Sequence, residues 1–177
     1  MITEIFDTNI VKILTLFSIS PGSKFPRKEI KEITKINNVP LDNSIVVLLK
    51  NRILIKEKRF YSLNFENESA KIIVEIIKKE YLRFKEISLH IYYLLIDTSA
   101  TFSTLNQIEN VYLFGSYAKL IHTEDSEVDL AIILREEYKE LIVSIKNRIR
   151  KIEKKYKKII ETHFYEEGDF NANDRLI

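Results

Sequence analysis

The sequence predicts an α+β protein with three successive regions. Residues 1–64 show three short helical patterns followed by two β-rich runs. Residues 65–103 show long amphipathic helical spacing, which is typical of linking helices. Residues 104–177 alternate strand-like apolar runs with helical spacing, in the order strand, helix, strand, helix, strand, which predicts a small α/β domain with a mixed sheet.

The first helix is predicted over residues 6–19, where Ile10, Leu14 and Phe17 share one face, and the residues from Ser20 to Ser23 end it. Pro26 precedes a second helix over residues 27–36, since proline is accepted in the first turn of a helix. A third helix is predicted from about Leu41, after the turn at Asn37 and Asn38.

Two β-rich runs, residues 53–55 and 60–63, flank the charged residues 56–59 and predict a hairpin. Three short helices and a hairpin within the first 64 residues are typical of a winged helix, a DNA-binding variant of helix-turn-helix architecture.

In such a domain the third helix would enter the major groove and the basic hairpin would lie on phosphates. The residues we expect to contact DNA are Asn43, Ser44, Arg52, Lys56, Lys58 and Arg59. Asp42, beside Asn43, would repel phosphate, and winged helices also dock proteins. Both DNA binding and protein docking therefore stay open.

Next come a long helix from Glu66 to about Ile87 and a helical or mixed stretch over residues 89–95. The residues predicted to form the buried stripe of the long helix are Ile72, Ile73, Ile76, Ile77, Tyr81 and Phe84. In the last region, strands are predicted over residues 111–114, 127–134 and 158–165, and helices over residues 117–122 and 137–156. The near-heptad spacing of the last helix also leaves a homodimer open.

Gly115 and Ser116 lie where a strand ends and a helix begins, so free backbone N–H groups and a hydroxyl meet there. Glycine lets a phosphate approach the main chain without a Cβ in the way. Lys119, one helical turn later, could neutralise a phosphate or be a plain surface lysine. Glu127 and Asp129 are two residues apart on the next strand, so both carboxylates leave one face, as a Mg²⁺–nucleotide complex requires.

The run LFGSYAKLIHTEDSEVDLAIIL, residues 113–134, resembles the signature of polymerase-beta-like nucleotidyltransferases, in particular the minimal nucleotidyltransferases of prokaryotes. Gly115 and Ser116 match the phosphate-binding pair of the family, and Ser126, Asp129 and Leu130 match its second element. The resemblance implies that two metal ions, Mg²⁺ or Mn²⁺, assist the transfer of a nucleoside monophosphate from a nucleoside triphosphate to a hydroxyl acceptor. ATP is the expected triphosphate.

Under this resemblance the catalytic residues are Glu127, Asp129 and Glu161, of which Glu127 and Asp129 bind the metal. The nucleotide-binding residues are Gly115, Ser116, Lys119 and Ser126. Glu161 is the natural third carboxylate, and Asp125 is the alternative. Minimal family members often modify a helical partner toxin, so a helical partner protein is expected too.

The sequence departs from the family pattern at two positions. Glu127 stands in place of an aspartate and reaches one methylene further, and Leu120 stands in place of a glycine. The rival hypothesis is therefore a non-catalytic DNA-binding regulator, whose degenerate nucleotidyltransferase domain senses a nucleotide or docks a partner.

Composition excludes several other classes of protein. The absence of cysteine rules out disulfides, thiol catalysis and cysteine zinc sites, and the three histidines, His90, His122 and His163, have no metal-binding spacing. With 31% charged residues and no apolar run approaching about 20 residues, no membrane span is expected. The N-terminus lacks the features of a secretory signal, so we expect a cytoplasmic protein.

Residues 1–64 carry 11 Lys and Arg against 6 Asp and Glu, which suggests that the two ends of the chain meet different partners.

Overall fold

The computed structural model describes residues 6–84, 86–135 and 139–166, and the chain divides into two units, residues 1–96 and 97–177. The boundary falls inside one helix, α5 (Leu89–Phe102), within the region expected to link two domains. Among the described residues no helix has both the length and the apolar character needed to cross a bilayer.

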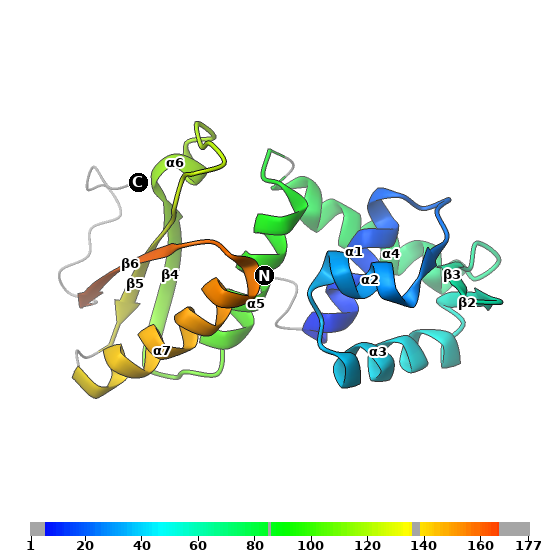
Figure 1. The fold of residues 1–177 in the computed structure, drawn as a ribbon, viewed down its shortest axis with the longest axis horizontal. Coiled ribbons are helices and arrows are strands. Elements are labelled where there is room, and N and C mark those ends of the chain that lie inside the picture. The colour runs from blue at the N-terminus through cyan, green and yellow to red at the C-terminus, as the bar shows by residue number, and fades with distance from the viewer. Residues whose placement is uncertain (1–5, 85, 136–138, 167–177) are drawn as a thin grey trace. The chain divides into compact units, whose positions relative to one another are not determined.

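The first unit places three helices, a short strand and a hairpin in sequence, followed by a fourth long helix (Figure 1). Its elements are α1 (Thr8–Ile19), β1 (Phe25–Pro26), α2 (Arg27–Thr34), α3 (Asn38–Lys50), β2 (Leu54–Glu57), β3 (Phe60–Leu63) and α4 (Glu68–Leu82). The strands form an antiparallel sheet in the order β1-β3-β2.

The predicted hairpin is confirmed: β2 and β3 pair from Leu54 with Leu63 to Glu57 with Phe60. Only Lys58 and Arg59 lie between the strands, and Lys58 has φ 55°. The third helix starts at Asn38, three residues earlier than expected, because Pro40 fits within its first turn. The two-residue strand β1 was not predicted.

The buried face of α4 differs from the sequence prediction. Ala70, Val74 and Ile77 are its buried residues, whereas Ile72 is 60% exposed and Ile76 is 44% exposed. The helix also ends at Leu82 rather than near Ile87. Apolar residues lie on more than one face of α4, so of the predicted stripe Ile77 is buried, whereas Ile72 and Ile76 are exposed. The buried face packs against α1, which makes α4 part of the first unit.

The second unit has the predicted order of strand, helix, strand, helix, strand. Its elements after α5 are β4 (Ile108–Phe114), α6 (Gly115–Ala118), β5 (Val128–Leu134), α7 (Lys139–Tyr156) and β6 (Ile160–Glu166). The sheet order is β4-β5-β6, antiparallel between β4 and β5 and parallel between β5 and β6, so the expected small mixed sheet is confirmed.

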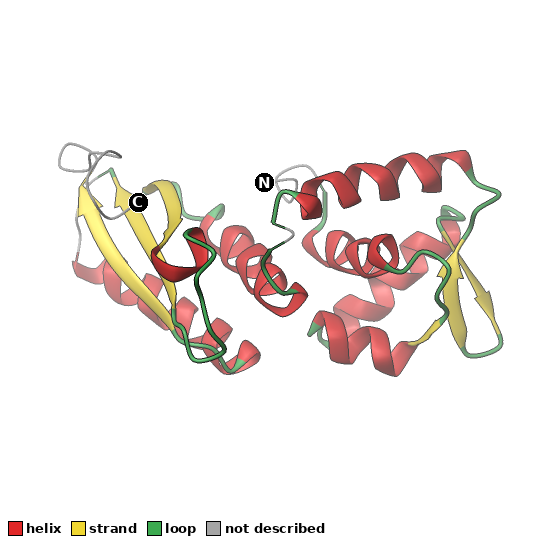
Figure 2. Ribbon diagram, turned by 90° about the horizontal axis from the view of Figure 1, so that it is seen from above, coloured by secondary structure: helices red, strands yellow, loops and turns green. Residues whose placement is uncertain are grey.

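Helix α7 runs along one face of this sheet (Figure 2). Its buried residues are Ile145, Ile149, Ile152 and Tyr156. Lys146 Nζ of α7 lies 5.7 Å from the ring centre of Phe164 on β6. Because side chains alternate along a strand, Phe164 and its register partner Ile132 lie on the face towards α7, and Asp129 and Glu161 lie on the opposite face.

Candidate functional site

Gly115 follows directly on β4 and begins α6 with φ +66°. This left-handed conformation suits glycine. A Cβ built on Gly115 would lie 1.9 Å from Oδ2 of Asp129, which is far too short for two atoms that are not bonded to each other. The absence of a side chain at Gly115 is therefore what lets the Asp129 carboxylate lie against the turn.

Asp129 joins this turn to the neighbouring strands. It pairs in register with Phe114 on β4 and with Glu161 on β6, and the backbone of Ser116 hydrogen-bonds to its carboxylate. Two carboxylates from adjacent strands thus lie beside the backbone turn at Gly115 and Ser116. The structure brings together four residues selected from the sequence: Gly115, Ser116, Asp129 and Glu161.

The electrostatics of Asp129 reflect this crowding. Partial burial raises the pKa of Asp129, and the nearby Glu161 carboxylate raises it further, whereas His163 and the Ser116 hydrogen bond oppose the rise. Two like charges that face each other, one of them partly buried, favour a cation between them. The pair therefore suits a divalent metal whose remaining ligands are phosphate oxygens and water, as Mg²⁺ commonly has in nucleotide sites.

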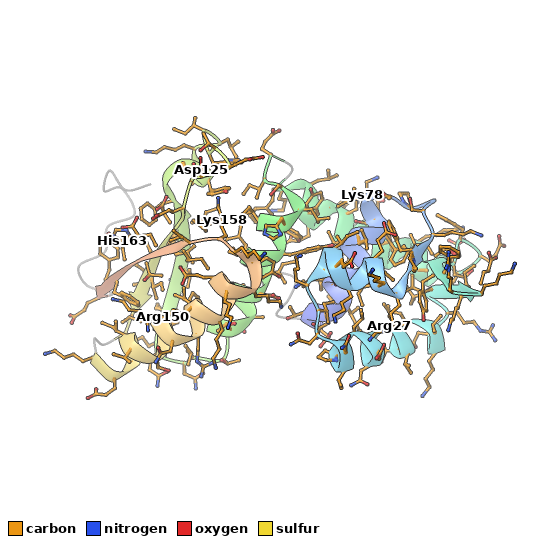
Figure 3. All side chains as sticks on the ribbon, viewed as in Figure 1. Arg27, Lys78, Asp125, Arg150, Lys158 and His163 are labelled. Carbon is orange, nitrogen blue, oxygen red and sulfur yellow. The ribbon has the colours of Figure 1, made fainter. Side chains whose placement is uncertain are left out.

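His163 belongs to the same face of the sheet. Its Nε2 lies 3.3 Å from Oε1 of Glu161, and its ring meets Phe114 edge to face at 5.2 Å between ring centres (Figure 3). The alternation of β6 already placed His163 on the face of Glu161. The structure shows in addition that the histidine contacts both the acid and the residue before the glycine turn.

Three other predicted site residues lie differently. Glu127 is exposed and precedes β5 by one residue, and within the described part of the chain no group of three His, Asp or Glu side chains lies close enough to hold a metal ion together. Lys119 is exposed at the end of α6. Ser126 Oγ accepts a hydrogen bond from the Thr123 N–H at 2.8 Å, so this serine closes the loop before β5.

That loop is held by contacts that the sequence did not reveal. Leu120 adopts φ +58°, the conformation for which glycine is usual, and the Ile121 N–H donates to the Ser116 carbonyl. The ring of His122 stacks on Tyr117 at 4.2 Å. Lys158, labelled in Figure 3, donates to the Glu124 carbonyl and lies 5.7 Å from the centre of the Tyr117 ring. Nothing distinguishes Lys158 in sequence from the lysines around it.

In the first unit, four predicted DNA-contacting cations, Arg52, Lys56, Lys58 and Arg59, are exposed at or beside the hairpin. Asn43 is exposed, but Ser44 is only 6% exposed, so its hydroxyl does not face a groove and the structure removes it from the candidate set. Arg27 forms two hydrogen bonds with the Asp42 carboxylate, at 2.6 and 2.9 Å, and lowers the pKa of Asp42.

Comparison with known proteins adds one finding. No curated protein and no solved structure matches the chain significantly. Residues 97–173 match the protein-family model described as "Polymerase beta, Nucleotidyltransferase". The matched range begins at the first residue of the second unit and contains the glycine turn, Asp129 and Glu161. The match shows that this part of the chain is similar to polymerase beta nucleotidyltransferases.

Proposed function

We propose that the second unit transfers a nucleoside monophosphate from a nucleoside triphosphate to a hydroxyl acceptor. The observation that carries the proposal is the contact between Asp129 and Gly115, which holds a carboxylate facing Glu161 against the glycine turn. The family match over residues 97–173 supports nucleotidyl transfer as the chemistry.

In the proposed reaction the acceptor oxygen attacks the α-phosphorus and forms a new P–O bond. The bond from that phosphorus to the bridging oxygen breaks, and pyrophosphate leaves with the electron pair. The glycine turn and the Ser116 hydroxyl hold the phosphates, and Glu161 accepts the proton of the acceptor hydroxyl. Most of the rate enhancement would come from positioning and from neutralisation of charge.

Asp129 and Glu161 are the residues that would hold a divalent metal, Mg²⁺ or Mn²⁺. When bound, the metal would neutralise the phosphate oxygens and polarise the α-phosphorus. Two protein carboxylates are sufficient for Mg²⁺, because the nucleotide supplies further oxygen ligands. Glu127 is proposed as a third ligand, which would require its exposed side chain to turn towards the site.

The direct test uses a nucleoside triphosphate labelled at its α-phosphate, with protein, RNA and small-molecule fractions as acceptors. Wild type is expected to label one fraction in a metal-dependent way, and Asp129→Asn to lose the label by at least about a hundredfold. Glu124→Gln, which changes an exposed acid whose side chain is not in the site, is the matched control. Equal labelling by wild type and Asp129→Asn would refute the proposal.

A second function, DNA binding by the first unit, is supported by the Arg27–Asp42 pair. The sequence left Asp42 as a repulsive charge beside Asn43, and Arg27 neutralises it. The element order of the unit also agrees with a winged helix.

If the protein is a regulator rather than an enzyme, the second unit binds a nucleotide without transferring it. The outer face of α3 nevertheless exposes Val39 and Val46, which favours the rival reading of protein docking.

Salt dependence separates DNA binding from protein docking. Replacing both Lys58 and Arg59 by Ala should lower the slope of log K against log salt for duplex DNA by about 2, since each lost phosphate contact removes about 0.9. The control, with Lys78 and Lys79 of α4 replaced by Ala, loses the same charge away from the hairpin. A slope that the hairpin variant leaves unchanged would rule out the hairpin as a phosphate contact.

A further inference from the structure

The charges of the second unit are strongly segregated. From Lys139 to Lys158, a segment that covers α7 and the two residues after it, there are nine Lys and Arg against two Glu. The rest of residues 109–177 carries three Lys and Arg against twelve Asp and Glu. A helix with an ordinary solvated face mixes both signs of charge, so α7 differs from the remainder of its unit.

Four of these cations form one stripe along the outer face of α7. The members of this basic stripe are Lys139, Lys146, Arg150 and Lys154, all of them exposed. They recur at helical spacing and lie away from the buried residues Ile145, Ile149 and Ile152. Of the two acids in this segment, Glu140 lies in the first turn of α7, and Glu153 points towards β6, where it accepts a hydrogen bond from the Ile160 N–H at 2.9 Å.

Local effects account for only part of this pattern. Cations are favoured in the last turn of a helix by its dipole, but the effect is confined to that turn, whereas Lys146 and Arg150 lie further back. Like charges four residues apart on a helix are mutually destabilising, by about 0.2–0.5 kcal/mol a pair. Arg150 and Lys154 form such a pair, and in the part of the chain that the structure describes neither has an acidic partner. An external polyanion would relieve this repulsion.

Beside the stripe lies an aromatic ring. Phe164 is partly exposed on β6, an edge strand of the sheet, and its ring centre is 5.7 Å from Lys146 Nζ. A row of cations next to an accessible aromatic ring is the combination by which proteins hold single-stranded nucleic acid, with phosphates on the cations and a base on the ring. Arg150 is labelled on α7 in Figure 3.

We propose that the basic stripe of α7, together with Phe164, is a binding surface for single-stranded nucleic acid. A membrane surface fits less well, because Val143 is the large apolar residue that α7 exposes. The stripe lies on the side of the sheet opposite Asp129 and Glu161, so the proposal is independent of the proposed transferase activity.

The test measures binding of a fluorescent single-stranded oligonucleotide to the full chain across a range of salt concentrations. Replacing Arg150 and Lys154 together by Gln should lower the slope of log K against log salt by about 1.4, or 0.7 for each phosphate contact with a single strand. Arg150→Lys with Lys154→Arg should restore binding. Phe164→Leu should weaken binding about tenfold with little change in slope, since it removes base stacking but no charge.

The control replaces Lys78 and Lys79 of α4 by Gln, which removes equal charge from exposed helical positions in the first unit. The proposal is overturned if wild type does not bind the oligonucleotide, if the α7 variant keeps its slope, or if the control variant loses as much. Binding of polyglutamate by a protein that does not bind the oligonucleotide would assign the surface to an acidic protein. That result would likewise overturn the proposal. Metal-dependent triphosphate binding should be equal in wild type and all these variants, which separates this test from that of the transferase.

Discussion

Asp129 meets Gly115 on one side and Glu161 on the other, so single substitutions at this point affect both folding and binding. The contact with Gly115 is closer than any side chain at that position would permit, and the contact with Glu161 places two negative charges together. The contact with Gly115 fixes the position of the Asp129 carboxylate. The contact with Glu161 raises the free energy of its charged form when no cation is bound. Each can be tested by a single change.

Gly115→Ala should destabilise the protein by about 2 kcal/mol or more, because a β-carbon must displace Asp129 and alanine is strained at positive φ. Urea unfolding measures the loss. The matched control is Gly22→Ala, where nothing lies within 4 Å of the new β-carbon, and this change should stay within about 0.5 kcal/mol. Similar stability of the two variants would show that Asp129 does not lie against the turn.

Asp129→Asn should stabilise the metal-free protein at neutral pH. The folded-state pKa of Asp129 is raised by burial and by Glu161, so the folded protein prefers the protonated form. Wild type therefore loses stability as the pH rises from the ordinary aspartate value of 3.8 through the raised pKa, and the variant does not.

Melting temperatures measured in a chelator should thus agree at acid pH and diverge in favour of the variant above that window. Added Mg²⁺ should stabilise wild type and remove the difference. A variant less stable than wild type at neutral pH in chelator would show that the Asp129 charge is not penalised.

At the scale of elements, the loop between α6 and β5 turns at Leu120 in the left-handed conformation that glycine adopts most easily. Leu120 supplies the left-handed conformation at a cost of roughly 1–2 kcal/mol. The stacking of His122 on Tyr117 and the bond from Lys158 to Glu124 hold the loop in place. The turn at Leu120 therefore forms at a cost in stability.

Leu120→Gly should consequently raise stability by about 0.5–1 kcal/mol, since it removes the strain and the leucine side chain is 53% exposed. Leu120→Ala keeps a β-carbon at positive φ and should give no gain. Chemical unfolding of both variants decides the point, and a glycine variant less stable than the alanine variant would contradict it.

The elements differ in how far the sequence predicted them. The hairpin and the order of helices and strands in the second unit followed from strong local patterns: turn residues between β-rich runs, and periodicity that changes from one element to the next. The buried face of α4 did not follow, because Ile72 and Ile76 continue its apolar pattern on the exposed side. The two-residue strand β1 depends on pairing with a distant strand and leaves no local signal.

Part of the candidate site was also predictable, because some of its residues belong to a local sequence pattern. Gly115, Ser116 and Asp129 belong to one short motif, whereas Glu161 was expected only from the family resemblance, and its pairing with Asp129 depends on a register between strands. Ser126 fits the motif but closes its own loop. Lys158 contacts that loop from more than thirty residues away, which no local pattern reports.

At the scale of the whole molecule, the chain combines two units with different surface chemistry. The second unit has its candidate site and its basic stripe on opposite faces of one small sheet. The first unit has its exposed cations at the hairpin. Nucleotide binding and polyanion binding should therefore respond to separate substitutions.

The central claim is that Asp129 and the glycine turn form a working nucleotide site. Calorimetry with ATP, GTP, CTP and UTP, with and without Mg²⁺, on wild type and Asp129→Ala tests it most directly. The account predicts that at least one triphosphate binds wild type only when the metal is present, and that Asp129→Ala abolishes this binding. Failure of all four to bind, or binding that ignores both the metal and Asp129, would contradict it.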